Sequence, residues 1–284
     1  MSLTERAPAK INLFLHVGAP GADGRHPVCS LAVFADVGDR LEAERADAFS
    51  LDVAGPFAAE VGPEADNLIT RALRAVGSPP LAVRLDKQLP VASGLGGGSS
   101  DAGAALRLAQ RLTPGLSGSD IEAAALSLGA DGLLCLRAET CIAEGEGEVL
   151  SAAPVLPPLP AVLVNPRVAC PTGAVYRAYD AGPGRFDAGR PGMPDRFATP
   201  REVAAFLAEQ RNDLEAPAVG LQPVIGEVLD ALAQPSQALL TRMSGSGATV
   251  FTLCATHADA SALAAELAED RPDWWVRACL LNPA

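Results

Sequence analysis

Apolar and polar residues alternate along several short stretches of the chain, which predicts strands whose side chains point to two different faces. In residues 7–17 this alternation puts Lys10, Asn12 and Phe14 on one face of a strand and apolar residues on the other. Further strands are predicted at residues 28–37, 40–53, 81–86, 133–136, 161–166 and 248–254.

Helical patterns and capping residues predict helices between these strands. The helices fall near residues 65–76, 99–112, 119–129, 201–209, 222–233 and 259–269. Ser119 and Glu122 form the pattern of a capping box, and Gly129 is placed to end the helix that follows. Asp131 then lies just beyond a helix end, where a carboxylate meets the negative end of the helix dipole. Such unfavourable local placements are expected at functional sites.

Prolines mark the point at which the chain divides. Four of them cluster within residues 152–160, a composition typical of a linker. We therefore predict one domain over residues 1–153 and a second over residues 154–284. In the second domain, residues 180–200 are rich in Gly, Pro and Asp, and we expect a long mobile loop there.

The composition of the 284 residues is globular, with 49% hydrophobic and 20% charged residues. A net charge of −12 without a basic stripe argues against nonspecific binding to nucleic acid or anionic lipid. No apolar run approaches the roughly 18 residues of a membrane span, and no signal peptide is visible, so we expect a cytoplasmic protein. The six cysteines form no CxxC pair and mostly lie in apolar runs, which predicts buried, reduced thiols.

Lysine is rare in this chain. Of the 22 basic residues only Lys10 and Lys87 are lysines, and arginine supplies the rest. A lysine that persists in such a chain indicates a need for a compact point charge. Lys10 lies in an otherwise apolar or neutral strand, where it can act on a transferring phosphate or on a nearby hydroxyl or carboxylate. The alternative is a strand-end lysine that extends to solvent.

The strongest motif is the turn Gly-Leu-Gly-Gly-Gly-Ser-Ser-Asp at residues 94–101, between a predicted strand and a predicted helix. Glycines let the backbone approach a ligand, and the unpaired N–H groups at a helix start bind anions. Ser99 and Ser100 add hydroxyl groups for a phosphate or a Mg²⁺ ion. The turn lacks the end of a Walker A loop and the spacing of a dinucleotide-binding loop. It therefore predicts a phosphate-binding turn, the alternative being an ordinary flexible loop.

Other candidate positions each allow two interpretations. Asp131 can accept the proton of an attacking hydroxyl, or it can be a solvated loop aspartate. His26 can contact a ligand or be a surface histidine. The Gly-Ser-Gly loop at residues 245–247 can line the same cleft as the phosphate turn or be a simple turn before a strand.

Taken together, these segments resemble the GHMP kinase superfamily, whose phosphate loop has a Pro-x-x-Gly-Leu-Gly-Gly-Gly/Ser-Ser-Ser type pattern. That pattern stands here at residues 90–100. Residues 8–15 and 23–26 resemble the branch of the superfamily that acts on a cytidyl diphosphate. Further motifs in the expected order are residues 66–69, 128–131, 211–214 and 243–248, so the resemblance covers nearly the whole chain.

The resemblance implies a two-lobed α+β fold, with ATP and substrate in the cleft. The N-terminal lobe would resemble the second domain of a small-ribosomal-subunit protein, and the C-terminal lobe would be ferredoxin-like. The implied reaction is ATP-dependent phosphorylation of a hydroxyl group on a cytidyl diphosphate substrate in isoprenoid precursor biosynthesis, with Mg²⁺ bridging the phosphates. We expect only small-molecule partners, no nucleic acid or membrane, and a monomer or weak homodimer.

The resemblance also implies roles for individual residues. Lys10 and Asp131 would be the catalytic pair, with Asp131 as the base toward the substrate hydroxyl and Lys10 steering it and stabilising charge. The implied ATP-binding residues are Asn67, at the adenosine, and the phosphate turn Val91, Ala92, Ser93, Gly94, Leu95, Gly96, Gly97, Gly98, Ser99, Ser100 and Asp101. The implied substrate-binding residues are Asn12, Arg25, His26, Tyr176, Gly245, Ser246 and Gly247, with His26 and Tyr176 at the cytidine.

Two positions depart from the family pattern. Arg25 stands where a tyrosine is usual, and Gly132-Leu133 replaces Val-Pro after Asp131. An arginine plane can still stack or pair with a phosphate, whereas the lost proline loosens the backbone that aims Asp131. These departures leave open a nucleotide-binding regulatory protein that has lost catalysis. A second alternative is a superfamily kinase for a sugar or a mevalonate-type alcohol, which the set of Lys10, His26 and Tyr176 argues against.

Overall fold

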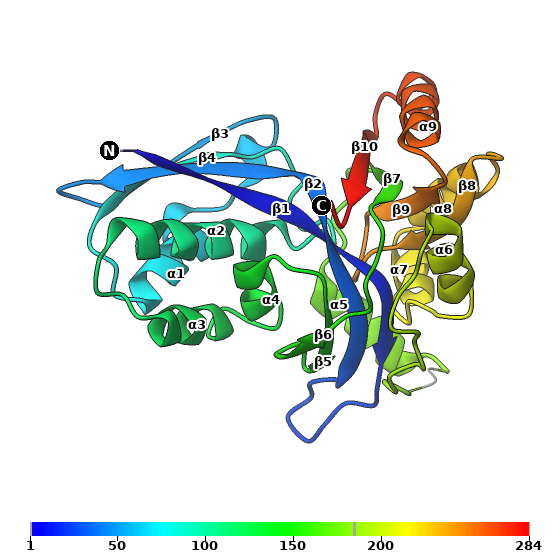
Figure 1. The fold of residues 1–284 in the computed structure, drawn as a ribbon, viewed down its shortest axis with the longest axis horizontal. Helices are drawn as coiled ribbons and strands as arrows, with labels where there is room; N and C mark the ends of the chain where they lie inside the picture. Colours follow the sequence, from blue (N-terminus) through cyan, green and yellow to red (C-terminus); the bar gives the residue numbers. More distant parts are fainter. Residues whose placement is uncertain (1, 184–185, 284) are drawn as a thin grey trace. The chain divides into compact units, whose positions relative to one another are not determined.

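The computed structural model describes residues 2–183 and 186–283, which form an α+β structure (Figure 1). The chain folds into two compact units whose segments alternate along the sequence. The first unit consists of Met1–Lys10, Gly38–Val91 and Gly96–Glu139, and the second of Ile11–Val37, Ala92–Leu95 and Thr140–Ala284. The predicted domain division after residue 153 stays a prediction.

The first unit is a small sheet covered by helices. Strand β3 (Ser50–Ala54) pairs in parallel with β4 (Leu81–Asp86), and β4 pairs antiparallel with the end of β2 (Val28–Arg45), which also pairs with β1 (Leu3–Val17). Apolar residues of the sheet, such as Leu85, share one core with α-helical residues such as Leu108. The helices are α1 (Leu68–Ala75), α2 (Gly97–Leu112), α3 (Gly118–Leu126) and α4 (Gly132–Arg137), with short 3₁₀ turns η1 (Ala58–Glu60) and η2 (Glu64–Asp66).

The second unit is built on an antiparallel sheet in the order β2, β10 (Trp275–Leu281), β7 (Leu159–Asn165), β9 (Val250–Cys254) and β8 (Ala238–Met243). Every residue of β7 is buried, as expected for a central strand covered on both faces. The hairpin of β5 (Cys141–Gly145) and β6 (Val149–Ala152) pairs with the start of β2. The helices are α5 (Thr172–Ala181), α6 (Pro200–Ala208), α7 (Glu215–Leu221), α8 (Val224–Ala233) and α9 (His257–Asp270).

Several predicted elements are confirmed, among them the strand over residues 81–86 and the helix that follows the glycine-rich turn. The two strands predicted at residues 28–37 and 40–53 are wrong in their boundaries, because β2 continues through Gly38 to Arg45 and β3 begins at Ser50. A side chain at position 38 would lie 2.3 Å from the carbonyl oxygen of Ala7, so this glycine serves close strand packing rather than a turn. The sequence prediction missed α5, α7, β8 and β10.

Two global expectations can be compared with the described residues. Among them, no helix combines the length and the hydrophobicity that crossing a membrane requires. All six cysteines are buried and no disulfide bond joins them, which confirms the expectation of buried, reduced thiols. The predicted loop at residues 180–200 is irregular between α5 and α6, apart from residues 184–185, which lie outside the described residues.

Candidate active site

Lys10 and Asp131 form an ion pair within the first unit. The Nζ atom of Lys10 lies 3.3 Å from Oδ2 of Asp131. Lys10 comes from β1 and is 4% exposed, whereas 38% of the Asp131 side chain is exposed. Burial therefore fixes the position of the cation, while the carboxylate remains accessible to a bound molecule. A hydroxyl group that approaches Asp131 would meet a proton acceptor with a positive charge beside it.

Asp131 precedes a helix, which corrects the predicted strand at residues 133–136. Those residues belong to α4, and Asp131 occupies the N-cap position of that helix without a capping hydrogen bond from its side chain. The prediction failed because a short apolar run fits a buried strand and a buried helix equally well. The carboxylate consequently lies at the positive end of the α4 dipole, so its placement is favourable and not the unfavourable one expected from the sequence.

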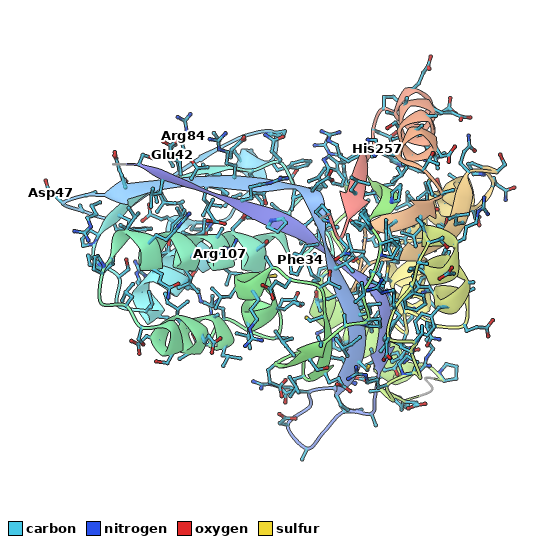
Figure 2. The ribbon with its side chains drawn as sticks, in the orientation of Figure 1. Phe34, Glu42, Asp47, Arg84, Arg107 and His257 are labelled. Carbon is cyan, nitrogen blue, oxygen red and sulfur yellow. The ribbon has the colours of Figure 1, made fainter. Side chains whose placement is uncertain are left out.

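Contacts at both ends hold α4, and with it Asp131, in place. From α2, the guanidinium of Arg107, labelled in Figure 2, donates hydrogen bonds to the carbonyl oxygens of Cys135 (3.0 Å) and Leu136 (2.8 Å). At the other end, a Cβ atom on Gly132 would lie 1.9 Å from the carbonyl oxygen of Ala125. Glycine is therefore needed at position 132 by packing against α3, which accounts for one of the two departures from the family pattern.

The capping prediction for α3 is wrong by two residues. Ser117, and not Ser119, caps the helix, because its hydroxyl accepts the backbone N–H of Asp120 (3.1 Å). The Ser117 hydroxyl also donates to the Asp120 carboxylate (2.7 Å), so the acidic partner in the first turn is Asp120 rather than Glu122. Two serines two residues apart made the sequence pattern ambiguous.

The glycine-rich turn has the backbone shape of an anion-binding loop. Ala92, Gly94 and Gly96 have φ angles of +50°, +78° and +62°. Alternation of left-handed with ordinary residues lets successive backbone N–H groups converge on an anion. Helix α2 then starts at Gly97, so its unpaired N–H groups continue the same arrangement.

Gly96 also lets the turn pack against Lys10 of β1. A Cβ atom at this position would lie 3.1 Å from Cε of Lys10, and its φ is left-handed. Both facts favour glycine, and both place the backbone of the turn directly beside the Lys10 side chain. The part of the turn from Gly96 onward and the Lys10–Asp131 pair therefore form one neighbourhood within the first unit.

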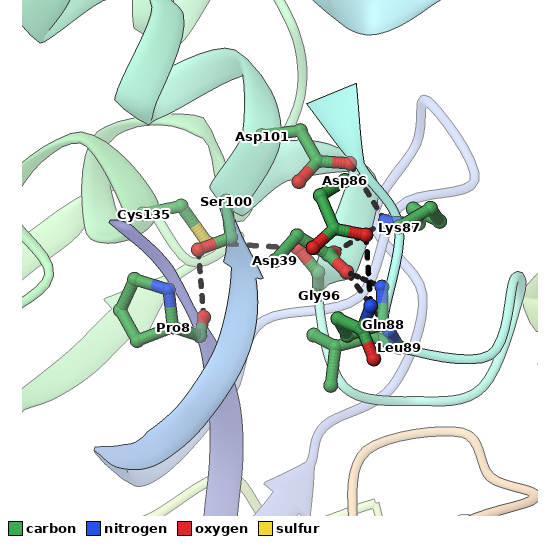
Figure 3. A network of polar contacts seen from close by, with 10 residues as sticks. All are labelled: Pro8, Asp39, Asp86, Lys87, Gln88, Leu89, Gly96, Ser100, Asp101 and Cys135. Atoms are coloured by element: carbon green, nitrogen blue, oxygen red, sulfur yellow. Dashed lines mark hydrogen bonds and ion pairs between the residues drawn. The ribbon is translucent and has the colours of Figure 1, made fainter. Parts of the chain in front are cut away.

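The two serines of the turn differ in what they can offer a ligand. Figure 3 shows the Ser100 hydroxyl donating to the carbonyl oxygen of Pro8 (2.7 Å), and the Ser100 side chain is fully buried. Ser100 thus ties the first turn of α2 to β1 close to Lys10, and its hydroxyl is not available to a phosphate or a metal. Ser99 is partly exposed and remains available.

Asn67 lies at the start of α1, beside the phosphate turn. Its Oδ1 atom accepts the backbone N–H of Ile69 (2.9 Å), as an N-cap residue does. Next to it in the chain, Leu68 comes within 3.3 Å of the position that a Cβ of Gly98 would take. The cap leaves the amide group of Asn67 to a ligand such as an adenine ring, and that role stays a prediction.

A second set of charges lies under the turn, and we name it the Lys87 cluster: Lys87, Asp39 and Asp101 (Figure 3). The Nζ atom of Lys87 lies 2.6 Å from Oδ2 of Asp39 and 2.6 Å from Oδ2 of Asp101. All three side chains are buried. Lys87 is conspicuous in the sequence as one of two lysines, although no role is predicted for it, whereas nothing in the sequence pattern points to Asp39. A signal was present, since a lysine kept in an arginine-rich chain points to a confined ion pair.

Asn12 is placed in the second unit by β1. Its side-chain amide donates to the Ser30 hydroxyl (2.7 Å), and its backbone N–H donates to the Ser244 hydroxyl (3.2 Å). The Ser244 hydroxyl in turn donates to the carbonyl oxygen of Gly94 (3.1 Å). The next residue, Gly245, lies beside both, because a Cβ atom there would be 3.2 Å from Oδ1 of Asn12 and 3.2 Å from the carbonyl oxygen of Gly94. The role of residues 245–247 in binding the substrate stays a prediction.

The motif at residues 211–214 supports this loop. The side-chain amide of Asn212 donates to the carbonyl oxygens of Met243 (2.8 Å) and Gly245 (2.8 Å). Within the loop, the Ser246 hydroxyl is hydrogen-bonded to that of Thr172 (2.8 Å), at the start of α5. A dense set of such bonds fixes the backbone of a loop that glycine alone would leave flexible.

His26 and Tyr176 lie together in the second unit, with their ring centroids 5.0 Å apart. The His26 Nδ1 atom is 2.8 Å from the carbonyl oxygen of Gly18, and its Nε2 atom is 3.3 Å from Asp180. Tyr179 packs edge-on against His26 at 5.9 Å. Sequence reasoning missed Asp180 and Tyr179 because it predicted no helix at α5, on which Tyr176 and Asp180 share a face.

Arg25 does not join this aromatic group. Its side chain is 70% exposed, and its guanidinium donates to the Glu146 carboxylate (2.8 Å) in the turn between β5 and β6. The glutamate raises the pKa of the guanidinium, and it also competes for any phosphate that Arg25 would bind. The substrate-binding role assigned to Arg25 stays a prediction without support from this geometry.

The described residues contain no cluster of three or more His, Cys, Asp or Glu side chains arranged to hold a metal ion. Mg²⁺ commonly binds through one or two protein groups together with substrate phosphates. The partly exposed Ser99 and Asp131 fit that mode, whereas the buried Ser100 does not.

Comparison with known proteins adds an independent line of support. Residues 67–140 match the model of the GHMP kinases N terminal domain, and residues 196–273 match GHMP kinases C terminal. The chain is 57% identical to the 4-diphosphocytidyl-2-C-methyl-D-erythritol kinase of Caulobacter vibrioides (strain NA1000 / CB15N), over 99% of this chain and 100% of that protein. It is 47% identical to the protein of that name from Hyphomonas neptunium, over 100% of this chain and 98% of that protein.

A solved structure is similar over the same extent. The crystal structure of a 4-(cytidine 5'-diphospho)-2C-methyl-D-erythritol kinase superposes with a TM-score of 0.77 at 33% identity. It covers 99% of this chain and 100% of its own. The likeness therefore holds for the whole described chain and not for one of its units alone.

Proposed function

We propose a function for this chain from the premise that it belongs to the GHMP kinases and, within them, to the 4-diphosphocytidyl-2-C-methyl-D-erythritol kinases. The chain transfers the γ-phosphoryl group of ATP to the 2-hydroxyl of 4-diphosphocytidyl-2-C-methyl-D-erythritol, a step of non-mevalonate isoprenoid biosynthesis. The observation that carries this proposal is the buried Lys10 beside the accessible Asp131, next to Gly96 of the phosphate turn.

Asp131 acts as the base in this proposal. Its carboxylate accepts the proton of the substrate hydroxyl as that oxygen attacks the γ-phosphorus, and the bond to the leaving ADP oxygen breaks. Lys10, held 3.3 Å away, stabilises the negative charge that develops between the attacking oxygen and the phosphoryl group. The fixed cation and the accessible carboxylate suit these two roles.

The phosphate turn binds the nucleotide through its backbone. N–H groups from Gly96 to Ser99 hold phosphate oxygens at the start of α2, and Asn67 contacts the adenosine. Ser99 would hold Mg²⁺ together with the phosphates. The ion supplies charge neutralisation on the β- and γ-phosphate oxygens when it is bound.

The cytidyl end of the substrate is assigned to the second unit. Tyr176 stacks on the cytosine, and His26 contacts it through a ring held by Gly18 and Asp180. Asn12 and the loop of Gly245, Ser246 and Gly247 bind the remainder of the substrate. We expect the protein to act in the cytoplasm as a monomer or weak homodimer, without nucleic acid as a partner.

A coupled assay of ADP release tests this proposal. With 4-diphosphocytidyl-2-C-methyl-D-erythritol as acceptor we expect sustained turnover, and with mevalonate or galactose at least about 10³-fold lower kcat/KM, because a buried polar pocket rejects ligands that leave it unpaired. Preference for mevalonate or galactose would favour another kinase of the superfamily. ATP binding without turnover on any acceptor would favour a regulatory protein.

A further inference from the structure

Asp180 places an accessible carboxylate among the side chains that the proposed function assigns to the cytidyl end of the substrate. It lies on α5 four residues after Tyr176, and residues at this spacing are neighbours on one face of a helix. Its Oδ1 atom is 3.3 Å from Nε2 of His26, and the ring centroids of His26 and Tyr176 are 5.0 Å apart. The carboxylate, the imidazole and the phenol ring therefore meet at one place in the second unit.

The position of Asp180 in its helix is unfavourable for a carboxylate. Asp180 is the last residue but one of α5, where the negative end of the helix dipole repels an anion. The last turn of α5, residues 178–181, is described in full and contains no basic residue that would offset this repulsion. A placement that works against the helix and lies beside a candidate site points to a function of the carboxylate itself.

The two members of the pair differ in accessibility and in what they can donate. The His26 side chain is 5% exposed, whereas that of Asp180 is 40% exposed. The Nδ1 atom of His26 lies 2.8 Å from the carbonyl oxygen of Gly18, and because a carbonyl oxygen only accepts, this nitrogen carries the hydrogen. When the imidazole is neutral, its Nε2 atom then has no hydrogen to donate to Asp180. The carboxylate, which can only accept, needs a donor from solvent or from a bound ligand.

The group at ring position 4 of a pyrimidine base decides whether this carboxylate attracts or repels it. Cytosine has an amino group there, which donates, whereas uracil has a carbonyl oxygen, which accepts. A base stacked on Tyr176 lies one helical turn from Asp180, about 5.4 Å along the helix axis, so its edge can reach the carboxylate. The amino group gains a charge-assisted hydrogen bond there, whereas the carbonyl oxygen would face a negative charge with no hydrogen between them.

We propose that Asp180 is a specificity-determining residue, and that its carboxylate accepts a hydrogen bond from the amino group of the cytosine ring. The chain thereby selects a cytidyl diphosphate over a uridyl diphosphate of otherwise identical structure. The inference rests on the cytidyl site of the proposed function and adds to it a direct contact between Asp180 and the base. Asp180 acts in binding alone and has no part in the transfer of the phosphoryl group.

Steady-state ADP release with two acceptors tests the inference. They are 4-diphosphocytidyl-2-C-methyl-D-erythritol and its uridyl counterpart, in which a carbonyl oxygen replaces the amino group. The unmodified chain should prefer the cytidyl acceptor by about 10²-fold or more in kcat/KM. In Asp180→Asn, whose amide can turn its oxygen toward cytosine or its NH₂ group toward uracil, this preference should fall at least about tenfold, the effect of one hydrogen bond to a charged group.

The separate kinetic constants distinguish binding from chemistry. In Asp180→Asn the KM for the cytidyl acceptor should rise while kcat stays within about threefold, because the contact is equal in the ground state and the transition state. Asp180→Ala removes both acceptor oxygens and should lower the preference to a similar extent, so the test does not depend on one variant. Asp270→Asn is the matched control, because it removes one exposed carboxylate from the last residue of another helix of the same unit, α9, and should keep the full preference.

Two results would overturn the inference. One is an equal or reversed kcat/KM for the two acceptors in the unmodified chain. The other is an unchanged preference in Asp180→Asn and Asp180→Ala, because a carboxylate that only holds the His26 ring would affect both acceptors equally. Absence of turnover with either acceptor in the unmodified chain would instead contradict the proposed function.

Discussion

The two lysines of the chain are buried beside aspartates in the same unit, yet their surroundings differ in one respect that decides what they can do. Lys10 pairs with the carboxylate of Asp131 at 3.3 Å, and 38% of that Asp131 side chain is exposed. Lys87 faces two carboxylates at 2.6 Å, and all three groups are closed off from solvent. A loose pair with one accessible member can exchange protons with a ligand, whereas a tight buried cluster can only hold charge and backbone in place.

A feature that the two lysines share explains why both positions need lysine. The Lys10 stem passes within contact distance of Gly96, and the Lys87 ammonium lies against Gly97. In both places the wider guanidinium of arginine would collide with the backbone of the phosphate turn. A chain that otherwise uses arginine throughout therefore keeps lysine at the two places where the turn leaves room for a narrow side chain.

The largest expected effect belongs to the buried cluster. Lys87→Met leaves two carboxylates under α2 without their cation, and we expect the free energy of unfolding to fall by about 3–5 kcal/mol, the cost of breaking a buried ion pair from one side. Urea unfolding followed by circular dichroism measures it. Lys10→Met, whose carboxylate partner is accessible to water, should lose at most about 1 kcal/mol. An equal decrease in the free energy of unfolding in the two variants would contradict the distinction between a buried cluster and an accessible pair.

Lys10→Arg tests whether the lysine of the accessible pair must be a narrow side chain. The charge is kept, but the guanidinium cannot occupy the narrow space beside Gly96, so we expect kcat to fall by about 10²-fold, a typical loss for one misplaced charge donor. Steady-state ADP release with the cytidyl substrate measures the change. Full activity of this variant would show that the compactness of lysine is irrelevant at this position.

Gly132→Ala tests whether the position of the Asp131 side chain depends on the packing of α4. The added methyl group would meet the carbonyl oxygen of Ala125, and the resulting shift should cost about 1–3 kcal/mol of stability and lower kcat in parallel. Gly118→Ala is the matched control, because a Cβ at that helix position has no neighbour within 4 Å and should be neutral or slightly stabilising. Thermal unfolding and kcat of the two variants are compared, and equal behaviour would contradict the packing role of Gly132.

A further expected effect is the pH dependence of stability that Asp101 contributes. Because burial raises the pKa of this group to about 7, well above its unfolded value, the folded state binds the proton more tightly. The stabilisation is present in full below the unfolded pKa and is lost as the pH rises through about 7. The free energy of unfolding of the unmodified chain, measured with urea, should therefore fall between pH 5 and pH 8 relative to that of Asp101→Asn. The same pH dependence of this free energy in both proteins would contradict the expectation.

The phosphate turn could be predicted because its motif stands in the sequence at residues 94–101. The groupings of Lys10 with Asp131 and of His26 with Tyr176 followed only from the resemblance to the family, because the residues alone left each position open. The geometry around Asp131 could not be predicted, because residues 133–136 form a short apolar run without the alternation of a strand or the spacing of an amphipathic helix. Asp39 could not be predicted because it contacts Lys87, which is 48 residues away in the sequence. The predicted strands also ended at residue 37 and began again at residue 40, whereas β2 runs through Asp39 without a break. Asp180 depended on the unpredicted helix α5.

The account is tested most directly by measuring kcat for ADP release in Asp131→Asn and Asp101→Asn side by side, with saturating ATP and 4-diphosphocytidyl-2-C-methyl-D-erythritol at about pH 7. Each substitution replaces the carboxyl group of one lysine group by an amide of the same shape. We predict that Asp131→Asn loses about 10²–10⁴-fold in kcat, as loss of a general base does, while Asp101→Asn stays within about threefold. Near-normal kcat in Asp131→Asn, or an equal loss in both variants, would contradict the assignment of catalysis to the accessible pair.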